Sequence, residues 1–368
     1  MHTIKMVDLQ RQYNSIKEPI DLAIRSVIET SDFIMGRAVA DFESKLCDYL
    51  KVKYAIGCAS GTDALQIALM ASGIGDGDEV ITSPFSFMAT TETILLLGAK
   101  PIFVDIDSQT YNLDVSQIGG QITSKTKAIL PVHLYGHPAD MKAILSLARA
   151  EGLFVIEDTA QAIGAQYFGA FAGTLGNLGC LSFFPSKNLG AFGDAGAIVT
   201  NDTQLAEQCR MIRLHGSRTK YRHEILGVNS RLDTIQAAVL KTKLPYLEGW
   251  LQKRIAIAKT YNRGFEKLPL ITPFCASNVR HVYHQYSLCT SRRDELATFL
   301  KENGVGSAIH YPVPLHRQGV YDKVEDLRTA LPNSERIASE IISLPMFPEL
   351  TESEIETIIS VVCKFYSS

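Results

Sequence analysis

Between about residues 50 and 200 the chain alternates short β-branched, apolar runs with segments of helical periodicity. Strands that alternate with crossover helices form a largely parallel sheet, and helices then cover both of its faces. Such a sheet belongs to the three-layer α/β class, which limits the possible folds more than any other feature of the chain. We expect its strands at residues 54–58, 79–82, 101–104, 128–132, 154–156, 180–184 and 197–200.

The pattern changes after Asn201. A loop is expected over 215–229, and it is followed by a long helical stretch over 232–262 that contains Pro245. The rest of the chain predicts a smaller α+β unit, with a strand near 286–289 and helices near 294–302, 334–342 and 352–366. We therefore divide the chain into a large α/β domain that includes an N-terminal helix, residues 1–245, and a small C-terminal α+β domain, residues 246–368.

Charge and composition exclude several classes of protein. The chain has 36 Lys+Arg against 39 Asp+Glu, so it lacks the basic excess that nucleic-acid binding needs. No apolar run approaches the length of a membrane span, and no signal-peptide stretch is present at the start. The 7 Cys are scattered without C-x-x-C spacing, which predicts reduced thiols and a cytoplasmic protein. We expect no metal site, because no Cys or carboxylate completes the His pairs 133/137, 281/284 and 310/316.

The segment from Ser60 to Asp63 lies between the first expected strand and a helix. Ser60 and Asp63 have the spacing of a capping box, which is the purely structural interpretation. In the functional interpretation, the N–H groups of Gly61 and Thr62 and the Thr62 hydroxyl bind a phosphate at the positive end of the helix. These residues alone leave both interpretations open.

Two further residues are of types that can bind a ligand or react with it. Asp158 follows the apolar run 153–156, at the carboxyl end of an expected parallel strand, where open α/β sheets bind ligands. An Asp there can also simply start a turn. Lys187 stands in a Gly-rich turn between two apolar strands, where a desolvated amine has a lowered pKa and can react with a carbonyl group. A phosphate cradle, a carboxylate and a reactive amine together predict a catalytic constellation.

In their order along the chain these segments resemble the DegT/DnrJ/EryC/StrS family of pyridoxal-phosphate-dependent sugar aminotransferases, which have fold type I. The resemblance extends from Met6 to the C-terminal helix. It implies a large domain of the aspartate aminotransferase type, with pyridoxal 5'-phosphate as cofactor and pyridoxamine phosphate as the intermediate form. Its most specific motifs lie at residues 60–65, 156–161, 182–196, 227–233 and 309–316.

The resemblance implies roles for individual residues around the cofactor. Lys187 would bind pyridoxal phosphate covalently, Asp158 would pair with the pyridine nitrogen, and Gln161 would hydrogen-bond the ring hydroxyl. Phe87 matches the aromatic residue that stacks on the ring; its alternative is a core aromatic of the following helix, with Phe85 in the stacking position. The phosphate would be held by Gly61, Thr62 and Ser182.

Two further motifs imply shared sites and a sugar pocket. Asn229 matches the residue that reaches the phosphate of the neighbouring subunit's cofactor, which implies a homodimer with shared active sites. His310, Tyr311 and Arg231 would surround the sugar. Arg231 could face a sugar carboxylate bidentately, and pairing with an Asp of its own chain is the alternative.

The implied reaction is ping-pong transamination, with glutamate as donor and a nucleotide-linked keto-sugar as acceptor. Lys187 would be the single acid/base that moves the proton. Related sugar 3-dehydratases have His where this chain has Lys187, so the lysine favours transamination over dehydration.

The sequence specifies the acceptor sugar less closely than it specifies the type of reaction. Residues 59–66, 228–233 and 343–346 are most similar to members that aminate C3 of a UDP-3-keto-N-acetylglucosaminuronate, a precursor for polysaccharides such as lipopolysaccharide. Residues 132–136 look more like dTDP-3-keto-6-deoxyhexose 3-aminotransferases, and amination at C4 stays open. The alternative from another class is a non-catalytic pyridoxal-phosphate-binding regulator. A nicotinamide-dependent dehydrogenase is disfavoured, because no strand-linked G-x-G-x-x-G is present.

Overall fold

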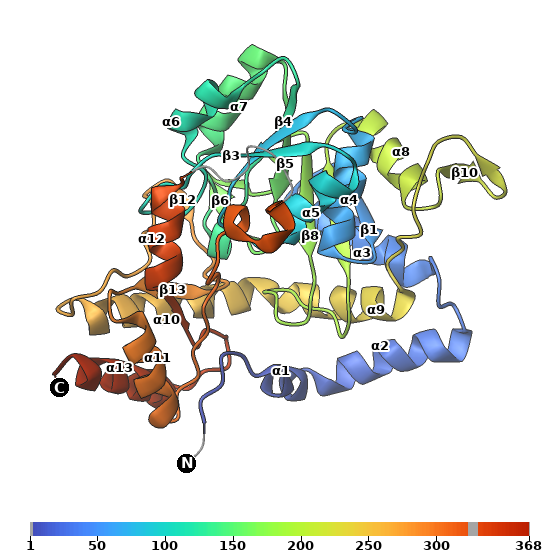
Figure 1. Ribbon diagram of the computed structural model, residues 1–368. Coiled ribbons are helices and arrows are strands. Elements are labelled where there is room, and N and C mark those ends of the chain that lie inside the picture. Colours follow the sequence, from blue (N-terminus) through green and yellow to red (C-terminus); the bar gives the residue numbers. More distant parts are fainter. Residues whose placement is uncertain (1–2, 323–329, 368) are drawn as a thin grey trace.

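The computed structural model describes residues 3–322 and 330–367. Its centre is a seven-stranded sheet with the order β1-β9-β8-β5-β4-β2-β3 (Figure 1). The strands from β3 to β8 pair in parallel, whereas β9 runs antiparallel to both β8 and β1. The bounds are β1 Tyr54–Cys58, β2 Glu79–Thr82, β3 Lys100–Phe103, β4 Thr126–Leu130, β5 Phe154–Asp158, β8 Leu178–Ser182 and β9 Gly196–Thr200. The predicted largely parallel α/β sheet of fold type I is confirmed.

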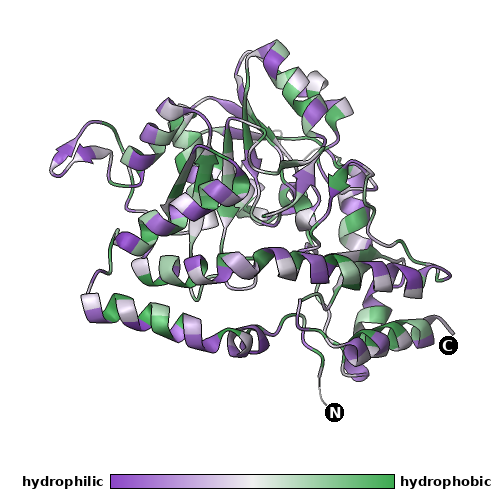
Figure 2. Cartoon of the chain, turned by 180° about the vertical axis from the view of Figure 1, so that it is seen from behind, coloured by the Kyte–Doolittle hydropathy of each residue, from purple (hydrophilic) through white to green (hydrophobic). Residues whose placement is uncertain are grey.

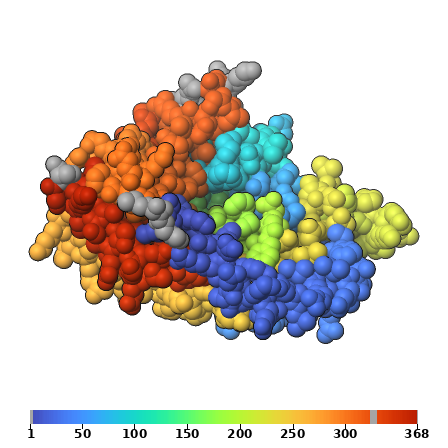
Figure 3. All heavy atoms as spheres, turned by 90° about the horizontal axis from the view of Figure 1, so that it is seen from below, coloured from blue at the N-terminus to red at the C-terminus, as the bar shows by residue number. Residues whose placement is uncertain are grey.

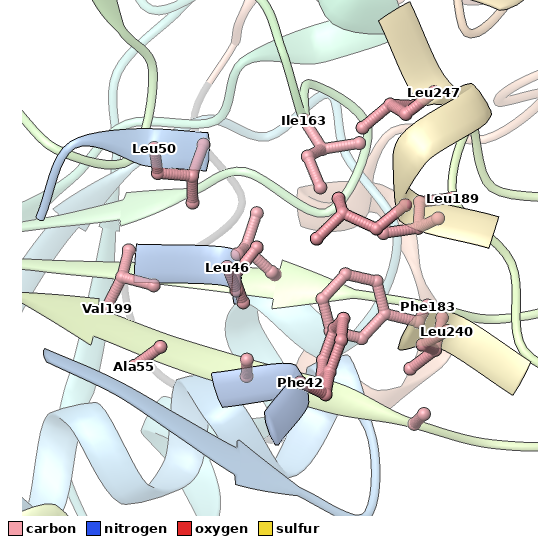
Figure 4. Close-up of a cluster of buried hydrophobic side chains, with 14 of the residues drawn as sticks. Phe42, Leu46, Leu50, Ala55, Ile163, Phe183, Leu189, Val199, Leu240 and Leu247 are labelled. Carbon is pink, nitrogen blue, oxygen red and sulfur yellow. The ribbon is translucent and has the colours of Figure 1, made fainter. Parts of the chain in front are cut away.

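Helices cover both faces of this sheet, as the continuous apolar strands require. One face packs against α4 Gly61–Ala71, α5 Ala89–Leu96 and α8 Thr203–Ile212. The other face packs against α3 Arg37–Leu50, α7 Met141–Glu151 and α9 Thr234–Lys243. Figure 4 shows the second interface, in which Phe42 of α3 meets Phe183 with ring centroids 5.4 Å apart.

The C-terminal unit is built around a short antiparallel pair, β13 with β14, and its helices. The N-terminal segment joins it, because Ile4 N donates to Gly304 O and Gly306 N donates to Ile4 O. The N-terminal helices and α13 also lie side by side on one face (Figure 3), where Arg11 pairs with Glu354 at 2.7 Å. The elements are α1 Leu9–Ser15, α2 Lys17–Thr30, α10 Leu247–Phe265, β13 Tyr286–Cys289, α11 Arg293–Glu302, α12 Pro332–Glu340, β14 Ile341–Leu344 and α13 Glu352–Ser367. The boundary near residue 245 stays a prediction.

Short elements complete the described chain. The expected loop over 215–229 contains a small hairpin that projects from the body at one end of the molecule (Figure 1), and most of its residues are hydrophilic (Figure 2). In the ranges 3–322 and 330–367, no helix is long and apolar enough to cross a bilayer. The remaining strands and helices are α6 Val115–Ile118, β6 Gln166–Tyr167, β7 Ala170–Phe171, β10 Ser217–Thr219, β11 Arg222–His223 and β12 Val279–Arg280, with 3₁₀ turns at Gly119–Gln121, Leu134–Gly136, Leu244–Tyr246, Leu315–Arg317 and Gly319–Tyr321.

The expected strand bounds lie within two residues of the observed ones; the strands expected at 128–132 and 180–184, for example, are Thr126–Leu130 and Leu178–Ser182. Three further differences have a structural cause. The helix expected over 334–342 ends at Glu340, and Ile341 and Ile342 instead pair with β13. Pairing with a distant strand overrides the local helical periodicity at these β-branched residues. The helix to which Phe87 would belong as a core aromatic begins at Ala89, which leaves Phe87 in the preceding loop. The long helix is interrupted at Leu244–Tyr246, where Pro245 stands in a single 3₁₀ turn.

Candidate active site

A cavity of about 480 Å³ opens at the carboxyl ends of β5 and β8, beside the N-terminus of α4. This is the edge at which parallel α/β sheets bind ligands. The predicted site residues in its lining come from five separate stretches of the sequence. The predicted site residues that line it are Gly61, Thr62, Phe87, Asp158, Gln161, Ser182, Lys187, His310 and Tyr311.

Lys187 lies in the turn that follows β8. Its N–H donates to Phe184 O at 2.8 Å, and the turn is anchored to α9 by Lys243 Nζ, which donates to Gly190 O at 2.7 Å. Within the described residues, no hydrogen bond or ion pair engages the Lys187 amine. Burial of the amine lowers the pKa of Lys187 to about 8, and the negative charge of Asp158 opposes this shift. The amine is therefore partly unprotonated near neutral pH, as a nucleophile or a general base requires.

Asp158 is the last residue of β5 and is only 5% exposed. Its carboxylate accepts hydrogen bonds from Thr90 Oγ1 at 2.9 Å and from Ala160 N at 3.1 Å. Burial raises the pKa of Asp158, while these two donors and the charge of Lys187 favour the ionised form. A buried carboxylate of this kind gains most from a protonated nitrogen placed opposite it in the cavity.

The neighbouring Glu157 has a structural role. Its carboxylate accepts hydrogen bonds from the N–H groups of Gly173, Leu175 and Gly176 at 2.6–2.8 Å and from His133 Nε2 at 2.8 Å. His133 Nδ1 in turn accepts from Ala139 N, so we assign the neutral tautomer with its proton on Nε2. Since successive side chains of a strand point to opposite faces, Glu157 lies outside the cavity that Asp158 lines.

The first turn of α4 forms an anion cradle. Ser60 uses its Oγ and its carbonyl to accept from the N–H groups of Asp63 and Ala64, whereas no described acceptor engages the N–H groups of Gly61 and Thr62. A Cβ on Gly61 would lie 2.5 Å from Ser182 Cβ, so only glycine lets the helix approach β8 this closely. Only half of the expected capping box forms, because the Asp63 carboxylate accepts from Ser230 Oγ instead of Ser60 N.

The residues expected around the cofactor ring differ in how firmly they are held. Gln161 accepts from Tyr135 N at 2.7 Å through Oε1 and donates to the Tyr311 hydroxyl at 3.0 Å through Nε2. Phe87 is 58% exposed and lines the cavity, whereas Phe85 is fully buried in the core. The placement excludes the interpretation of Phe87 as a core aromatic, and its stacking on the ring stays a prediction.

Asn229 and Arg231 lie outside this cavity. Asn229 is exposed at the base of the hairpin segment, and Arg231 is half-buried without an ion pair to any described residue. The alternative in which Arg231 pairs with an Asp of its own chain is therefore not found in residues 3–322 and 330–367. Ser230, which stands between the two, is buried and bonded to Asp63, so the segment is attached to the first turn of α4.

Thr90 and His284 are among the lining side chains that the sequence interpretation missed. Thr90 bonds Asp158 from α5, and His284 stands just before β13. In the sequence, His284 is only one member of a histidine pair that no further ligand completes into a metal site. Within the described residues, no group of three or more His, Cys, Asp or Glu side chains could hold a metal ion. A lone His or Thr carries no motif, so only the fold reveals these two residues.

The residues at this edge fit pyridoxal phosphate. The open N–H groups of α4 and the narrow approach to Ser182 suit a phosphate group. Asp158 suits a protonated pyridine nitrogen, and Lys187 supplies a free amine with a pKa of about 8. All three features face one cavity, as a single cofactor requires.

Several known proteins are similar to this chain over almost its whole length. The model of the DegT/DnrJ/EryC1/StrS aminotransferase family matches residues 14–363. A Geobacillus stearothermophilus protein named pleiotropic regulatory protein is 48% identical over 366 residues, which are 99% of this chain and 98% of that protein. The UDP-2-acetamido-2-deoxy-3-oxo-D-glucuronate aminotransferase of Pseudomonas aeruginosa is 46% identical over 355 residues, with coverage of 96% and 98%. The crystal structure of S. venezuelae DesV in complex with a ketimine intermediate is similar, with a TM-score of 0.98, 40% identity and 100% coverage of both chains.

Proposed function

Because this chain belongs to the DegT/DnrJ/EryC1/StrS aminotransferase family, whose members use pyridoxal phosphate, we propose that it transfers an amino group from glutamate to a nucleotide-linked keto-sugar. The acceptor that we propose is a UDP-3-keto-hexuronate, aminated at C3. The observation that carries the proposal is the placement of Lys187 and the buried Asp158 in one cavity with the anion cradle of α4. The product would serve the synthesis of polysaccharide or glycan precursors in the cytoplasm.

Each residue contributes one physical task to the reaction. Pyridoxal phosphate, when bound, supplies an electron sink for the carbanion that forms at the donor's α-carbon. Asp158 holds a proton on the ring nitrogen, because its buried carboxylate is best compensated by a cation. Lys187 would take the proton from the donor's α-carbon and deliver it to C4′ of the cofactor, which its pKa of about 8 permits near neutral pH. Gly61, Thr62 and Ser182 would bind the phosphate and so hold the cofactor in the cavity that Asp158 and Lys187 line.

The choice of acceptor depends on similarity and on Arg231. The P. aeruginosa relative at 46% identity is named for a 3-oxo-glucuronate substrate, which supports a uronic acid for this chain. The guanidinium of Arg231 has no partner among the described residues and can bind a carboxylate bidentately. Its place outside the cavity of its own chain fits a homodimer, in which Asn229 and Arg231 of the partner subunit complete each site.

Two other acceptors and one other class remain as alternatives. Amination of a dTDP-3-keto-6-deoxyhexose or of a 4-keto-sugar would use the same cofactor residues. The G. stearothermophilus relative is named as a regulatory protein, which favours a non-catalytic regulator as the second candidate function. A free, partly unprotonated amine beside a buried carboxylate supports turnover over mere cofactor binding.

A spectrum and a substrate panel test the proposal. The purified protein should show the visible band of bound pyridoxal phosphate, and glutamate should bleach it. Amination is then measured with UDP- and dTDP-linked 3-keto and 4-keto sugars, with and without a C6 carboxylate. A protein that binds the cofactor but aminates none of them would be the regulator instead.

Arg231 is tested through discrimination between acceptors. Arg231→Lys should reduce the preference for the uronic acid over the matched uncharged hexose by about tenfold, because a lysine cannot make the bidentate contact. Arg263→Lys, an exposed arginine of α10, is the matched control. If Arg231→Lys leaves the preference unchanged, the carboxylate contact is wrong.

A further inference from the structure

His284 is a cavity residue to which the proposed mechanism gives no task. It stands just before β13, lines the cavity together with Lys187 and His310, and is only 6% exposed. A polar side chain buried to this degree is normally bonded to a protein group or reserved for a ligand. Its surroundings therefore decide what it can bind.

The main chain of His284 is fixed from two sides. His284 N donates to Tyr135 O at 2.8 Å. Arg254, a buried residue of α10, donates through Nη1 to Tyr283 O at 3.2 Å and to His284 O at 3.4 Å. The imidazole is therefore presented to the cavity from a rigid backbone, which is the property of a pre-organised binding group.

The two ring nitrogens of His284 differ in their surroundings. Nδ1 is buried and has no hydrogen-bond partner among the described residues. A buried N–H without an acceptor is rare, so we assign the proton to Nε2. Burial, followed by the positive charges of Lys187, Arg254 and His310, holds the pKa of His284 well below its usual range. The ring is therefore neutral and has one N–H to donate.

We propose that His284 binds the acceptor sugar by donating its Nε2–H to an uncharged oxygen, a hydroxyl or the keto oxygen, close to the carbon that receives the amino group. The inference rests on the proposed function, because it requires a sugar in the cavity. Glutamate presents two carboxylates, for which charged donors are the strong partners. A neutral imidazole donates a directional hydrogen bond without carrying a charge, which suits an uncharged sugar oxygen.

The ping-pong reaction allows the inference to be tested, since its two halves can be measured separately through the cofactor's absorbance. His284→Phe should lower the rate of the sugar half-reaction at limiting sugar by about 10- to 100-fold, the usual cost of losing a hydrogen bond to a buried partner. The glutamate half-reaction should change by less than about threefold. An equal loss in both halves would overturn the proposal.

Two further variants distinguish a lost hydrogen bond to the sugar from a structural defect in the protein. His284→Asn keeps an N–H donor and should recover most of the sugar half-reaction, with the pH profile of the wild type. His281→Phe is the matched control, because His281 is equally buried but outside the cavity, with its ring stacked on Tyr283 at 3.8 Å. It should leave both half-reactions within about threefold of wild type.

The outcomes also separate this inference from the proposed function. If the wild type aminates no sugar of the panel, the proposed function fails and the inference fails with it. If the wild type does so and His284→Phe matches it, or if His284→Asn is as slow as His284→Phe, only the role of His284 is wrong. A changed pH profile in His284→Asn would identify an acid or base instead of a neutral donor.

Discussion

The two ends of the cavity are built in different ways. The proposed cofactor end consists of Gly61, Thr62, Asp158, Ser182 and Lys187, which stand in the first turn of α4, at the ends of β5 and β8 and in the turn after β8. The sugar end consists of His284, Gln285, His310 and Tyr311, which come from the C-terminal part of the chain. The proposed cofactor end is thus fixed by the large sheet and α4, whereas the proposed sugar end depends on how the C-terminal part of the chain packs against them. Substitutions at the cofactor end should affect both half-reactions, and those at the sugar end mainly one, except at Tyr311, which is bonded to Gln161.

The largest effect is expected for Lys187→Ala. Loss of the only acid/base at the reacting carbon should lower kcat by about 10³-fold or more in both half-reactions. Single-turnover absorbance measurements with each substrate check this. Lys127→Ala, an exposed lysine of β4, should behave like the wild type. Full turnover by Lys187→Ala would contradict the assignment of the cofactor end.

The pH dependence of cofactor attachment should follow the amine of Lys187. Only the unprotonated amine reacts, and its pKa is lowered to about 8. The rate of covalent attachment to the apoprotein should therefore fall about tenfold per unit below pH 8 and level off above it. Stopped-flow absorbance between pH 6 and 10 gives this curve. A rate that still rises tenfold per unit at pH 10 would place the pKa at the value of an ordinary lysine.

Asp158→Asn should lower kcat by about 10²-fold in both half-reactions, because the neutral amide no longer favours a proton on the ring nitrogen. Thr90→Val is its comparison, since it removes one donor to the carboxylate but keeps the charge. Thr90→Val should lower kcat by less than about tenfold. Equal losses in the two variants would mean that orientation matters more than charge.

Gly61→Ala should weaken cofactor affinity by about tenfold with little effect on kcat at saturating cofactor. The added methyl group would lie 2.5 Å from Ser182 Cβ and force α4 away from β8. Equilibrium titration of the apoprotein measures the affinity. Gly75→Ala is the control, because the nearest atom to its Cβ would be 4.0 Å away.

Tyr311→Phe should have the smallest effect, about two- to fivefold. The Tyr311 hydroxyl accepts from Gln161 Nε2 and so connects the sugar end to the cofactor end. The loss should therefore appear equally in both half-reactions, unlike the loss in His284→Phe. Tyr366→Phe, which removes a hydroxyl bonded to Thr290 away from the cavity, is the control.

The two ends also differ in how far the sequence predicts them. Asp158 and Lys187 could be placed at one edge because parallel strands share their carboxyl ends, and this follows from the order of elements alone. His284 could not, because a lone His shows its role only when a distant unit brings it to the cavity. Ile341 and Ile342 were misassigned to a helix for the same reason, since their pairing with β13 depends on contacts across the chain. Asn229 and Arg231 would contribute to a site only in the proposed homodimer, whose contacts do not follow from the order of elements in one chain.

The hydrogen bonds of the Glu157 carboxylate limit which insertions or deletions β5 can accept. A slip of one residue would turn Glu157 into the cavity and Asp158 onto the opposite face. The hydrogen bonds that Glu157 accepts from the 173–176 loop and from His133 exist in one register only. The register that places Asp158 in the cavity is therefore stabilised by Glu157, which lies outside the cavity. We expect β5 to tolerate substitutions of side chains far better than insertions or deletions.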